Sequence, residues 1–273
     1  MELLAPTRWH CVDFISDLHL QASDTKTFET LSYYLNHTAA DAVFILGDLF
    51  EVWVGDDALA TDGGFERRCA DLLHSTGLKL DLYIMHGNRD FLMGASLMQA
   101  CHATLLKDPT VLVFAGQRWL LGHGDAWCLA DTQYMQFRAQ VRHPDWQTQF
   151  LQKPLTERVG LARGMRAQSE ARKRTTANYA DVDAATANAL LESAQAHHMI
   201  HGHTHRPARH VMDASRERLV LSDWDLMAVP PRAEVLRLRR LEDTAGGSGS
   251  YSVERLPPTM AAGGRPITPK PAG

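Results

Sequence analysis

Five short segments place acidic, amide or imidazole side chains directly after an apolar run. They are Asp17-Leu18-His19, Gly47-Asp48, Gly87-Asn88-Arg89-Asp90, Gly122-His123-Gly124-Asp125 and Gly202-His203-Thr204-His205. Loops beyond the carboxyl ends of neighbouring strands gather at one edge of a sheet, so these side chains can share a pocket. Alternate residues of an extended segment project to the same side, so an Asp-x-His or His-x-His pair can present two ligands. The five segments therefore predict one polar site.

The candidate ligands are carboxylate, amide and imidazole groups, and none is a thiolate. They are Asp17, His19, Asp48, Asn88, His123, His203 and His205. Such donors suit Mn²⁺, Fe²⁺ or Zn²⁺, and two ions sharing a bridging carboxylate would use all of them. Two ions about 3.5–4 Å apart would activate water and hold the attacking and leaving oxygens of a phosphoryl displacement. A single Gly-Asp is usually a turn, but the joint occurrence of five segments favours hydrolysis of a phosphate ester or anhydride.

Apolar runs alternate with helical spacing in the first half of the chain. Strands are predicted at 11–15, 42–46 and 80–85, and helices begin after Asp24 and run over 64–76. This strand-helix-strand-helix-strand order is typical of an α/β layer architecture with largely parallel strands. The polar segments would then follow the strands at one sheet edge.

Consecutive strands replace this alternation from residue 110 onward. A hairpin is predicted around 115–117, with further strands at 198–200, 209–212, 219–222, 233–238 and 251–256, the last two paired. Between them, residues 131–196 are polar and Ala-rich with helical spacing, broken at Pro144 and Pro154. We predict a single domain over 1–256 with a helical lid at about 127–180. The Pro, Gly and Ala content of 257–273 predicts a disordered tail.

Composition and charge exclude several classes of protein. The chain has 273 residues, of which 45% are hydrophobic and 22% charged, as in soluble globular proteins. The net charge of −4 argues against non-specific binding of nucleic acid. Four widely spaced cysteines without a C-x-x-C pair are typical of reduced, buried thiols in a cytosolic protein. The longest uncharged stretch, 91–106, is shorter than the roughly 20 apolar residues that cross a bilayer, and we expect no signal peptide.

The five segments resemble the motifs of the calcineurin-like metallophosphoesterases, D-x-H, G-D, G-N-H-[DE], H and G-H-x-H, across residues 13–205. The resemblance implies an α/β fold in which two mixed β-sheets form a sandwich flanked by helices. It implies one metal ion on Asp17, His19, Asp48 and His205, and a second on Asp48, Asn88, His123 and His203. Asp48 would bridge the two ions, and the catalytic residues would be Asp48, Asn88, Arg89 and His123.

Arg89 stands where most members of this family have a histidine after Gly-Asn. Arginine cannot act as an acid near pH 7, but its planar fork suits a phosphate oxyanion. This departure, with the long motifs at 47–57, 86–92 and 201–207, closely resembles one subfamily, the UDP-2,3-diacylglucosamine diphosphatases of lipid A biosynthesis. The similarity extends from about 12 to 240.

The subfamily resemblance implies a lipid substrate. The reaction would hydrolyse the pyrophosphate of UDP-2,3-diacylglucosamine to UMP and 2,3-diacylglucosamine 1-phosphate (lipid X), by attack of activated water at the α-phosphorus, with Mn²⁺ as the usual metal. The protein would lie peripherally on the cytoplasmic side of the inner membrane of a Gram-negative bacterium. Substrate contacts would come from Asn88, Arg89, Asp131, Ser169, Lys173 and His203. Lys173 lies in a stretch, 172–176, that departs from the subfamily's pattern.

The predicted lid is rich in apolar and basic side chains. Its aromatic and aliphatic residues over 127–165 fit either core packing or an apolar groove for acyl chains. Its arginines fit either solvated helix faces or attraction to phosphates and an anionic membrane surface.

Two other functions use the same motifs. A generic metallophosphoesterase for soluble nucleotides would need the metals but no apolar lid. A binding scaffold that kept the fold and lost its metals is disfavoured by the intact set of seven ligands.

Overall fold

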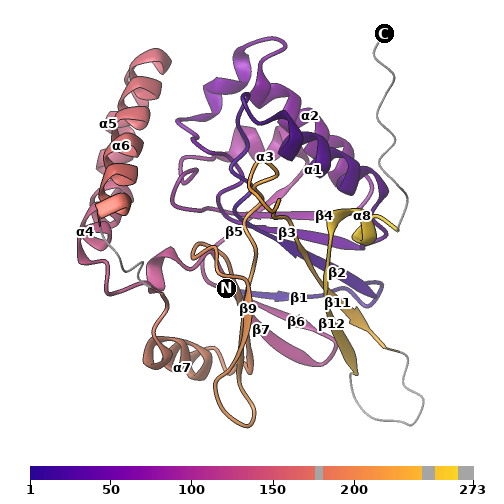
Figure 1. The fold of residues 1–273 in the computed structure, drawn as a ribbon. Helices are drawn as coiled ribbons and strands as arrows, with labels where there is room; N and C mark the ends of the chain where they lie inside the picture. Colours follow the sequence, from indigo (N-terminus) through magenta and orange to yellow (C-terminus); the bar gives the residue numbers. More distant parts are fainter. Residues whose placement is uncertain (176–180, 242–249, 264–273) are drawn as a thin grey trace.

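Two β-sheets pack face to face, with helices on both outer faces (Figure 1). The computed structural model describes residues 1–175, 181–241 and 250–263, with the side chains of all but 167–175. The predicted sandwich of two mixed sheets flanked by helices is confirmed.

The first sheet contains the strands of the predicted parallel half. Its members are β2 (Cys11–Ile15), β3 (Ala42–Leu46), β4 (Asp81–Met85), β5 (Thr104–Leu106), β11 (Val235–Arg240) and β12 (Tyr251–Leu256). Their order is β12-β11-β2-β3-β4-β5, with β2 to β5 parallel and β11 antiparallel to both of its neighbours. The predicted pairing of the last two strands is confirmed.

The second sheet is also mixed. Its members are β1 (Glu2–Leu4), β6 (Thr110–Phe114), β7 (Gln117–Gly122), β8 (His198–His201), β9 (Ala208–Val211) and β10 (Glu217–Val220). Their order is β1-β6-β7-β8-β10-β9, with β6 and β7 forming the predicted hairpin and β7 running parallel to β8.

Alternation along the strands builds two separate apolar layers. Phe14 and Phe44 point into the interface between the sheets, where their rings stack with centroids 5.1 Å apart. Residues on the opposite face of the same strands, such as Val43 and Ile45, pack beneath the helices. Burial on both faces explains why these strands read as nearly continuous apolar runs.

Helices cover the outer faces of the sandwich. α1 (Thr25–His37), α2 (Phe65–Gly77) and α3 (Ala95–Cys101) pack on the first sheet, and α7 (Ala184–Ser193) packs on the second. Asp24 caps α1 as predicted, since its carboxylate accepts a hydrogen bond from Thr27 N. Two short 3₁₀ helices, η1 (Asp56–Ala60) and η2 (Asp125–Trp127), follow β3 and β7.

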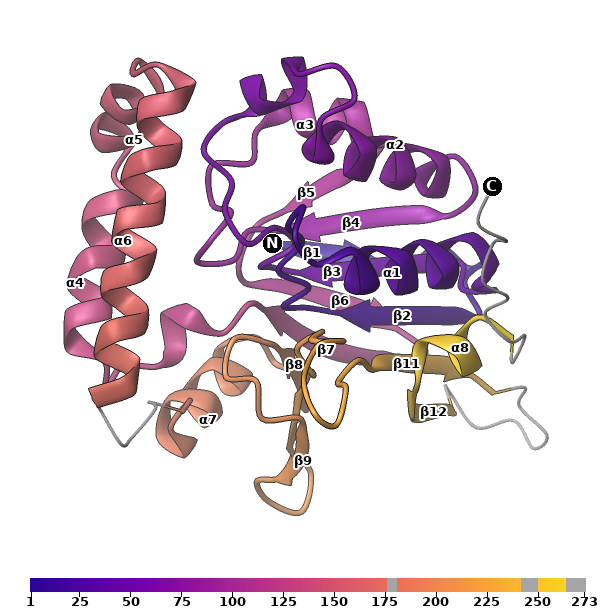
Figure 2. The same cartoon turned by 45° about the horizontal axis from the view of Figure 1, so that its top comes forward.

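Three further helices stand beside one edge of the sandwich. α4 (Thr132–Val141), α5 (Pro144–Leu151) and α6 (Leu155–Thr175) form this group, which we call the lid helices (Figures 1 and 2). Pro144 begins α5 and Pro154 precedes α6, so the two predicted breaks separate the helices. In Figure 2 the arrowheads of β2 and β4 point toward the lid helices, so the lid helices lie at the carboxyl ends of these strands.

The prediction of a disordered tail from residue 257 is wrong for its first residues. α8 (Pro258–Ala261) has proline at its first turn, where no backbone donor is lost, and Ala261 and Ala262 are buried. The Arg237 guanidinium donates to Ala261 O at 2.9 Å, and also forms a buried pair with Asp13. Residues 264–273 lie outside the described part of the chain.

β1, α3 and β5 were not predicted. The prediction that the four cysteines are unpaired and buried is confirmed. Cys11, Cys69, Cys101 and Cys128 are all free and buried. Among the described residues, none of the helices combines the length and apolar character needed to cross a bilayer.

Candidate metal centre

The seven predicted ligands come together where the two sheets meet. β2 leads to Asp17 and His19, β3 to Asp48 and β4 to Asn88, all from the first sheet. In the second sheet, β7 leads to His123, and β8 to His203 and His205. The parallel directions of β2, β3 and β4, and of β7 and β8, bring all these loops to the same edge.

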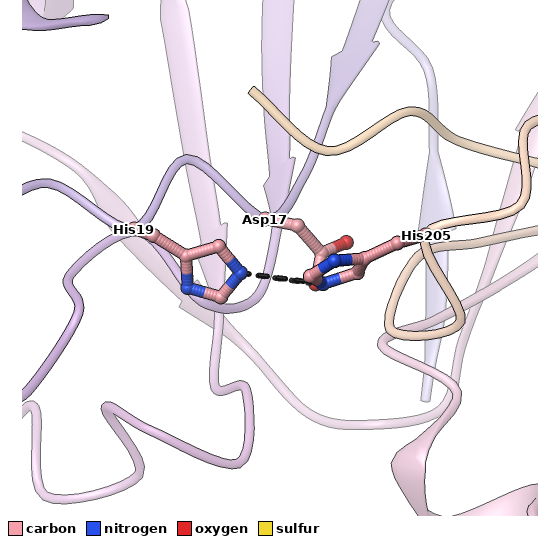
Figure 3. Close-up of side chains that lie close together, drawn as sticks. All are labelled: Asp17, His19 and His205. Carbon is pink, nitrogen blue, oxygen red and sulfur yellow. Dashed lines mark hydrogen bonds and ion pairs between the residues drawn. The ribbon is translucent and has the colours of Figure 1, made fainter. Parts of the chain in front are cut away.

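One group of donors is formed by Asp17, His19 and His205 (Figure 3). The Nε2 atoms of the two imidazoles are 3.3 Å apart, and His205 Nε2 is 3.2 Å from Asp17 Oδ1. His19 Nε2 is 3.9 Å from the same oxygen. Three ligand atoms from two loops, those after β2 and β8, therefore face one another.

A second group surrounds the amide oxygen of Asn88. His123 Nε2 lies 3.0 Å and His203 Nδ1 2.8 Å from Asn88 Oδ1, and Asp48 Oδ1 is 3.7 Å from His123 Nε2. Asp17 belongs to this neighbourhood too, because its carboxylate, Asp48 and His123 offer ligand atoms within 4.8 Å of one another. Asp17 is thus the residue common to the two compact groups, whereas the family resemblance implies that Asp48 bridges the two ions.

The charge of the pocket fits a divalent cation. Burial disfavours the imidazolium form of His123, but three carboxylates outweigh burial and raise its pKa to about 9. They belong to Asp48, Asp17 and Asp125. A pocket that draws a proton onto a fully buried imidazole favours positive charge, which a metal ion supplies. The oxygen and nitrogen donors are those of divalent transition metals.

Most of the predicted ligand residues have a backbone conformation that residues other than glycine rarely adopt. Asp17, His19, Asp48, His203 and His205 all have positive φ, between 48° and 68°. Each such non-glycine residue costs free energy, and this strain concentrates at functional sites.

Two glycines permit the close approach of these loops. A methyl group on Gly87 would overlap Oδ1 of Asp48, and one on Gly202 would overlap Oδ2 of Asp17. Glycine is required at both positions because the backbone touches a ligand carboxylate. These are the glycines of the predicted Gly-Asn and Gly-His segments.

Arg89 lies beside the donors with its guanidinium between two carboxylates. Its Nε is 3.3 Å from Asp48 Oδ2, and its Nη1 donates to Glu51 Oε2 at 2.7 Å. Burial opposes the charge of Arg89, but Asp48 and Glu51 outweigh it and raise its pKa further. Arg89 therefore stays cationic and cannot donate a proton at neutral pH.

Asp125 connects the centre to the lid helices, and sequence reasoning assigned it no role. Its buried Oδ2 accepts hydrogen bonds from the Tyr134 hydroxyl and, at 2.8 Å, from Arg138 Nε, both on α4. Arg142 Nη2 donates to Gly87 O at 2.8 Å, next to Asn88. The sequence feature that could have identified Asp125 is its position two residues after the predicted ligand His123.

The predicted substrate contacts are placed unevenly. Asn88, Arg89 and His203 lie at the centre, whereas Asp131 is exposed and caps α4 by accepting from Tyr134 N at 3.0 Å. Ser169 and Lys173 lie in α6, of which the structure describes only the backbone at these positions.

The apolar side chains of the lid region divide into two sets. Phe150 and Trp127 are buried, Phe150 in the core beneath the helices of the first sheet and Trp127 in the layer under α7. Phe137, Leu151 and Leu161 are exposed by 37–42%. Core packing therefore explains some of these residues and leaves others facing solvent.

The chain is similar to known proteins in sequence and in fold. A family profile described as Calcineurin-like phosphoesterase matches residues 12–207. A UDP-2,3-diacylglucosamine hydrolase from Chromobacterium violaceum is 47% identical, covering 78% of this chain and 90% of its own length. One from Cellvibrio japonicus is 44% identical, covering 77% and 90%. A solved structure of Vps29 from Entamoeba histolytica is 14% identical with a TM-score of 0.44, over 90% of this chain and 98% of that one. On the sequence matches, this chain belongs to the calcineurin-like phosphoesterases.

Proposed function

We propose that this protein hydrolyses the pyrophosphate of UDP-2,3-diacylglucosamine to UMP and 2,3-diacylglucosamine 1-phosphate, in lipid A biosynthesis. The observation that carries the proposal is the convergence of two carboxylates, an amide and four imidazoles beside a permanently cationic Arg89. Relatives named for this substrate, at 44–47% identity over most of both chains, support the choice of substrate.

We propose that two Mn²⁺ ions bind the seven donors. One ion is assigned to Asp17, His19, Asp48 and His205, and the other to Asp48, Asn88, His123 and His203. Bound there, the ions would supply a nucleophilic water near neutral pH and neutralise charge on the reacting phosphate. Asp48 Oδ1 lies 3.7 Å from His123 Nε2, and Asp48 offers a ligand atom within 4.8 Å of one from Asp17, a member of the first donor group, which supports its bridging role.

Arg89 is proposed to bind a phosphate oxygen of the pyrophosphate. Its guanidinium can neutralise charge that develops on the bridging and terminal oxygens as the α-phosphorus is attacked. The sugar phosphate that leaves is already a stable anion, so its departure needs no proton donor. The reaction therefore does not require the histidine that most of the family has at the position of Arg89.

The lid helices are proposed to hold the lipid part of the substrate. They stand at the carboxyl ends of β2 and β4, and α4 contacts the centre through Asp125 and Gly87 O. The exposed Phe137, Leu151 and Leu161 supply apolar surface for acyl chains. Asp131, Ser169 and Lys173 are the proposed headgroup contacts from the same region. We further propose that the protein works peripherally at the cytoplasmic face of the inner membrane.

Turnover of the lipid substrate tests the proposal. The protein is incubated with UDP-2,3-diacylglucosamine, Mn²⁺ and ¹⁸O-labelled water, and the products are identified by mass spectrometry. We expect UMP and 2,3-diacylglucosamine 1-phosphate, with the label in UMP, because the attacked α-phosphorus stays with the nucleoside. Label in the sugar phosphate would contradict attack at this atom. Hydrolysis of cyclic AMP without any turnover of the lipid would favour the soluble-nucleotide alternative instead.

A further inference from the structure

Glu51 is a largely buried carboxylate that the metal assignment leaves unused. It follows β3 by five residues, and its backbone N donates to Leu20 O at 3.1 Å. This bond fixes Glu51 alongside the segment that carries His19. The side chain is 14% exposed and belongs to neither of the compact donor groups.

Three cationic or titratable side chains from three parts of the fold face this carboxylate. Its Oε2 lies 3.3 Å from His19 Nδ1 and accepts from Arg89 Nη1 at 2.7 Å. Its Oε1 forms an ion pair with Arg166 Nε of lid helix α6. The guanidinium groups of Arg89 and Arg166 balance the negative charge of this largely buried carboxylate.

The two nitrogens of His19 face different partners. Nε2 points to His205 Nε2 and Asp17 Oδ1, within the first donor group. Nδ1 is buried and makes no hydrogen bond with the described residues, and Glu51 Oε2 lies 3.3 Å from it. An ionised carboxylate beside Nδ1 favours the tautomer with its proton there, which leaves the lone pair of Nε2 free for a metal ion.

We propose that Glu51 is a positioning residue that couples the lid to the metal centre. Its carboxylate holds the Nδ1-protonated tautomer of His19, directs Arg89 toward the reacting phosphate, and ties α6 to both through Arg166. The inference rests on the proposed function, since it takes His19 as a metal ligand.

A second ion pair on the same helix provides a matched control. Arg158, near the start of α6, pairs with Asp57 and donates to Val54 O. Asp57 lies six residues after Glu51, so both carboxylates hold α6 along one segment of chain. We call Arg166–Glu51 the inner ion pair and Arg158–Asp57 the outer ion pair. Only the inner pair includes a residue that also faces His19 and Arg89.

Calorimetric titration with Mn²⁺, without substrate, tests the coupling. The wild-type protein, Glu51→Gln and Asp57→Asn are compared, after circular dichroism shows that all three are folded. We expect Glu51→Gln to weaken Mn²⁺ binding by about 10- to 100-fold, the usual cost of removing a carboxylate that orients a ligand histidine. Asp57→Asn should bind within about twofold of wild type. Glu51→Asp, which keeps the charge on a shorter side chain, should be intermediate, and it replaces Glu51→Gln if that variant does not fold.

Hydrogen exchange of α6 and steady-state kinetics complete the test. Both ion-pair variants should raise amide exchange in α6, but only Glu51→Gln should also lower Mn²⁺ affinity and kcat. Equal Mn²⁺ affinity in wild type and Glu51→Gln would overturn the role of Glu51. Equal weakening by both variants would overturn it too, because loosening of the lid would then suffice. Absence of Mn²⁺ binding by the wild-type protein would instead refute the metal site itself.

Discussion

Asp48→Asn is the sharpest test of a shared carboxylate in the centre. Only two of the seven donors, Asp17 and Asp48, carry negative charge, so the substitution halves the charge available to two dications. Unit charges 4 Å apart attract by about 4 kcal/mol at an effective dielectric constant of about 20. Even about two-thirds of this energy corresponds to a 100-fold loss of metal affinity.

Thermal unfolding with and without Mn²⁺ measures that loss. At a Mn²⁺ concentration of 100 times the wild-type Kd, binding adds about 2.7 kcal/mol to the free energy of unfolding. For a chain of this size this raises Tm by about 5–11 °C. A variant that binds 100-fold more weakly gains about 0.4 kcal/mol at the same concentration, or about 1 °C.

The metal-free proteins provide the control for this comparison. Asn has the same shape as Asp and keeps an oxygen that can accept the hydrogen bond from Arg89 N, which is 2.9 Å long in the structure. The metal-free Tm of the variant should therefore lie near that of wild type. If Asp48→Asn kept the full Mn²⁺-dependent rise in Tm, the reasoning that Asp48 serves both donor groups would be refuted.

Three further predictions concern charge in and beneath the centre. Arg89→His should lower the rate of UMP release by more than about tenfold, because the cation held by Glu51 is lost; an unchanged kcat would leave Arg89 a structural residue. Arg237→Met should lower the free energy of unfolding by about 3–5 kcal/mol in urea denaturation, since it leaves the fully buried Asp13 without its bidentate partner; a loss below about 1 kcal/mol would contradict this. Burial lowers the pKa of His201 to about 3. Between pH 3 and about 6.5, the unfolded chain therefore binds a proton at this histidine that the folded chain excludes. The free energy of unfolding should thus decrease as the pH falls through this range. His201→Asn should make this slope shallower in urea titrations at pH 4–6.5, and an unchanged slope would show that His201 is protonated in the folded state.

The local signals in the sequence predicted the framework of the centre well. β2 and β3 have the predicted bounds of 11–15 and 42–46, and every predicted ligand follows its strand, because runs buried on both faces end where the polar segments begin. The chemical types of the donors were also readable, since each sits in a short segment of fixed spacing.

The features that the sequence did not predict depend on contacts between residues far apart in the chain. Glu51 gains its place through His19, Arg89 and Arg166, which lie far from it in the chain or on a different element. α8 is stabilised by packing and by one bond from Arg237, so its Pro- and Ala-rich sequence looks unstructured by itself. Neither apolar periodicity nor motif spacing records such contacts.

The division of the donors between the two sheets sets an order of events during folding. The first sheet supplies both carboxylates but a single imidazole, His19, whereas the other three imidazoles follow strands of the second sheet. His205 reaches Asp17 across 188 residues of chain. A partly folded chain with only its amino-terminal strands in place lacks most of the nitrogen ligands. With a metal held by these proposed ligands, tight capture would be a late step, and a bound ion would cross-link the two sheets only after the sandwich has closed.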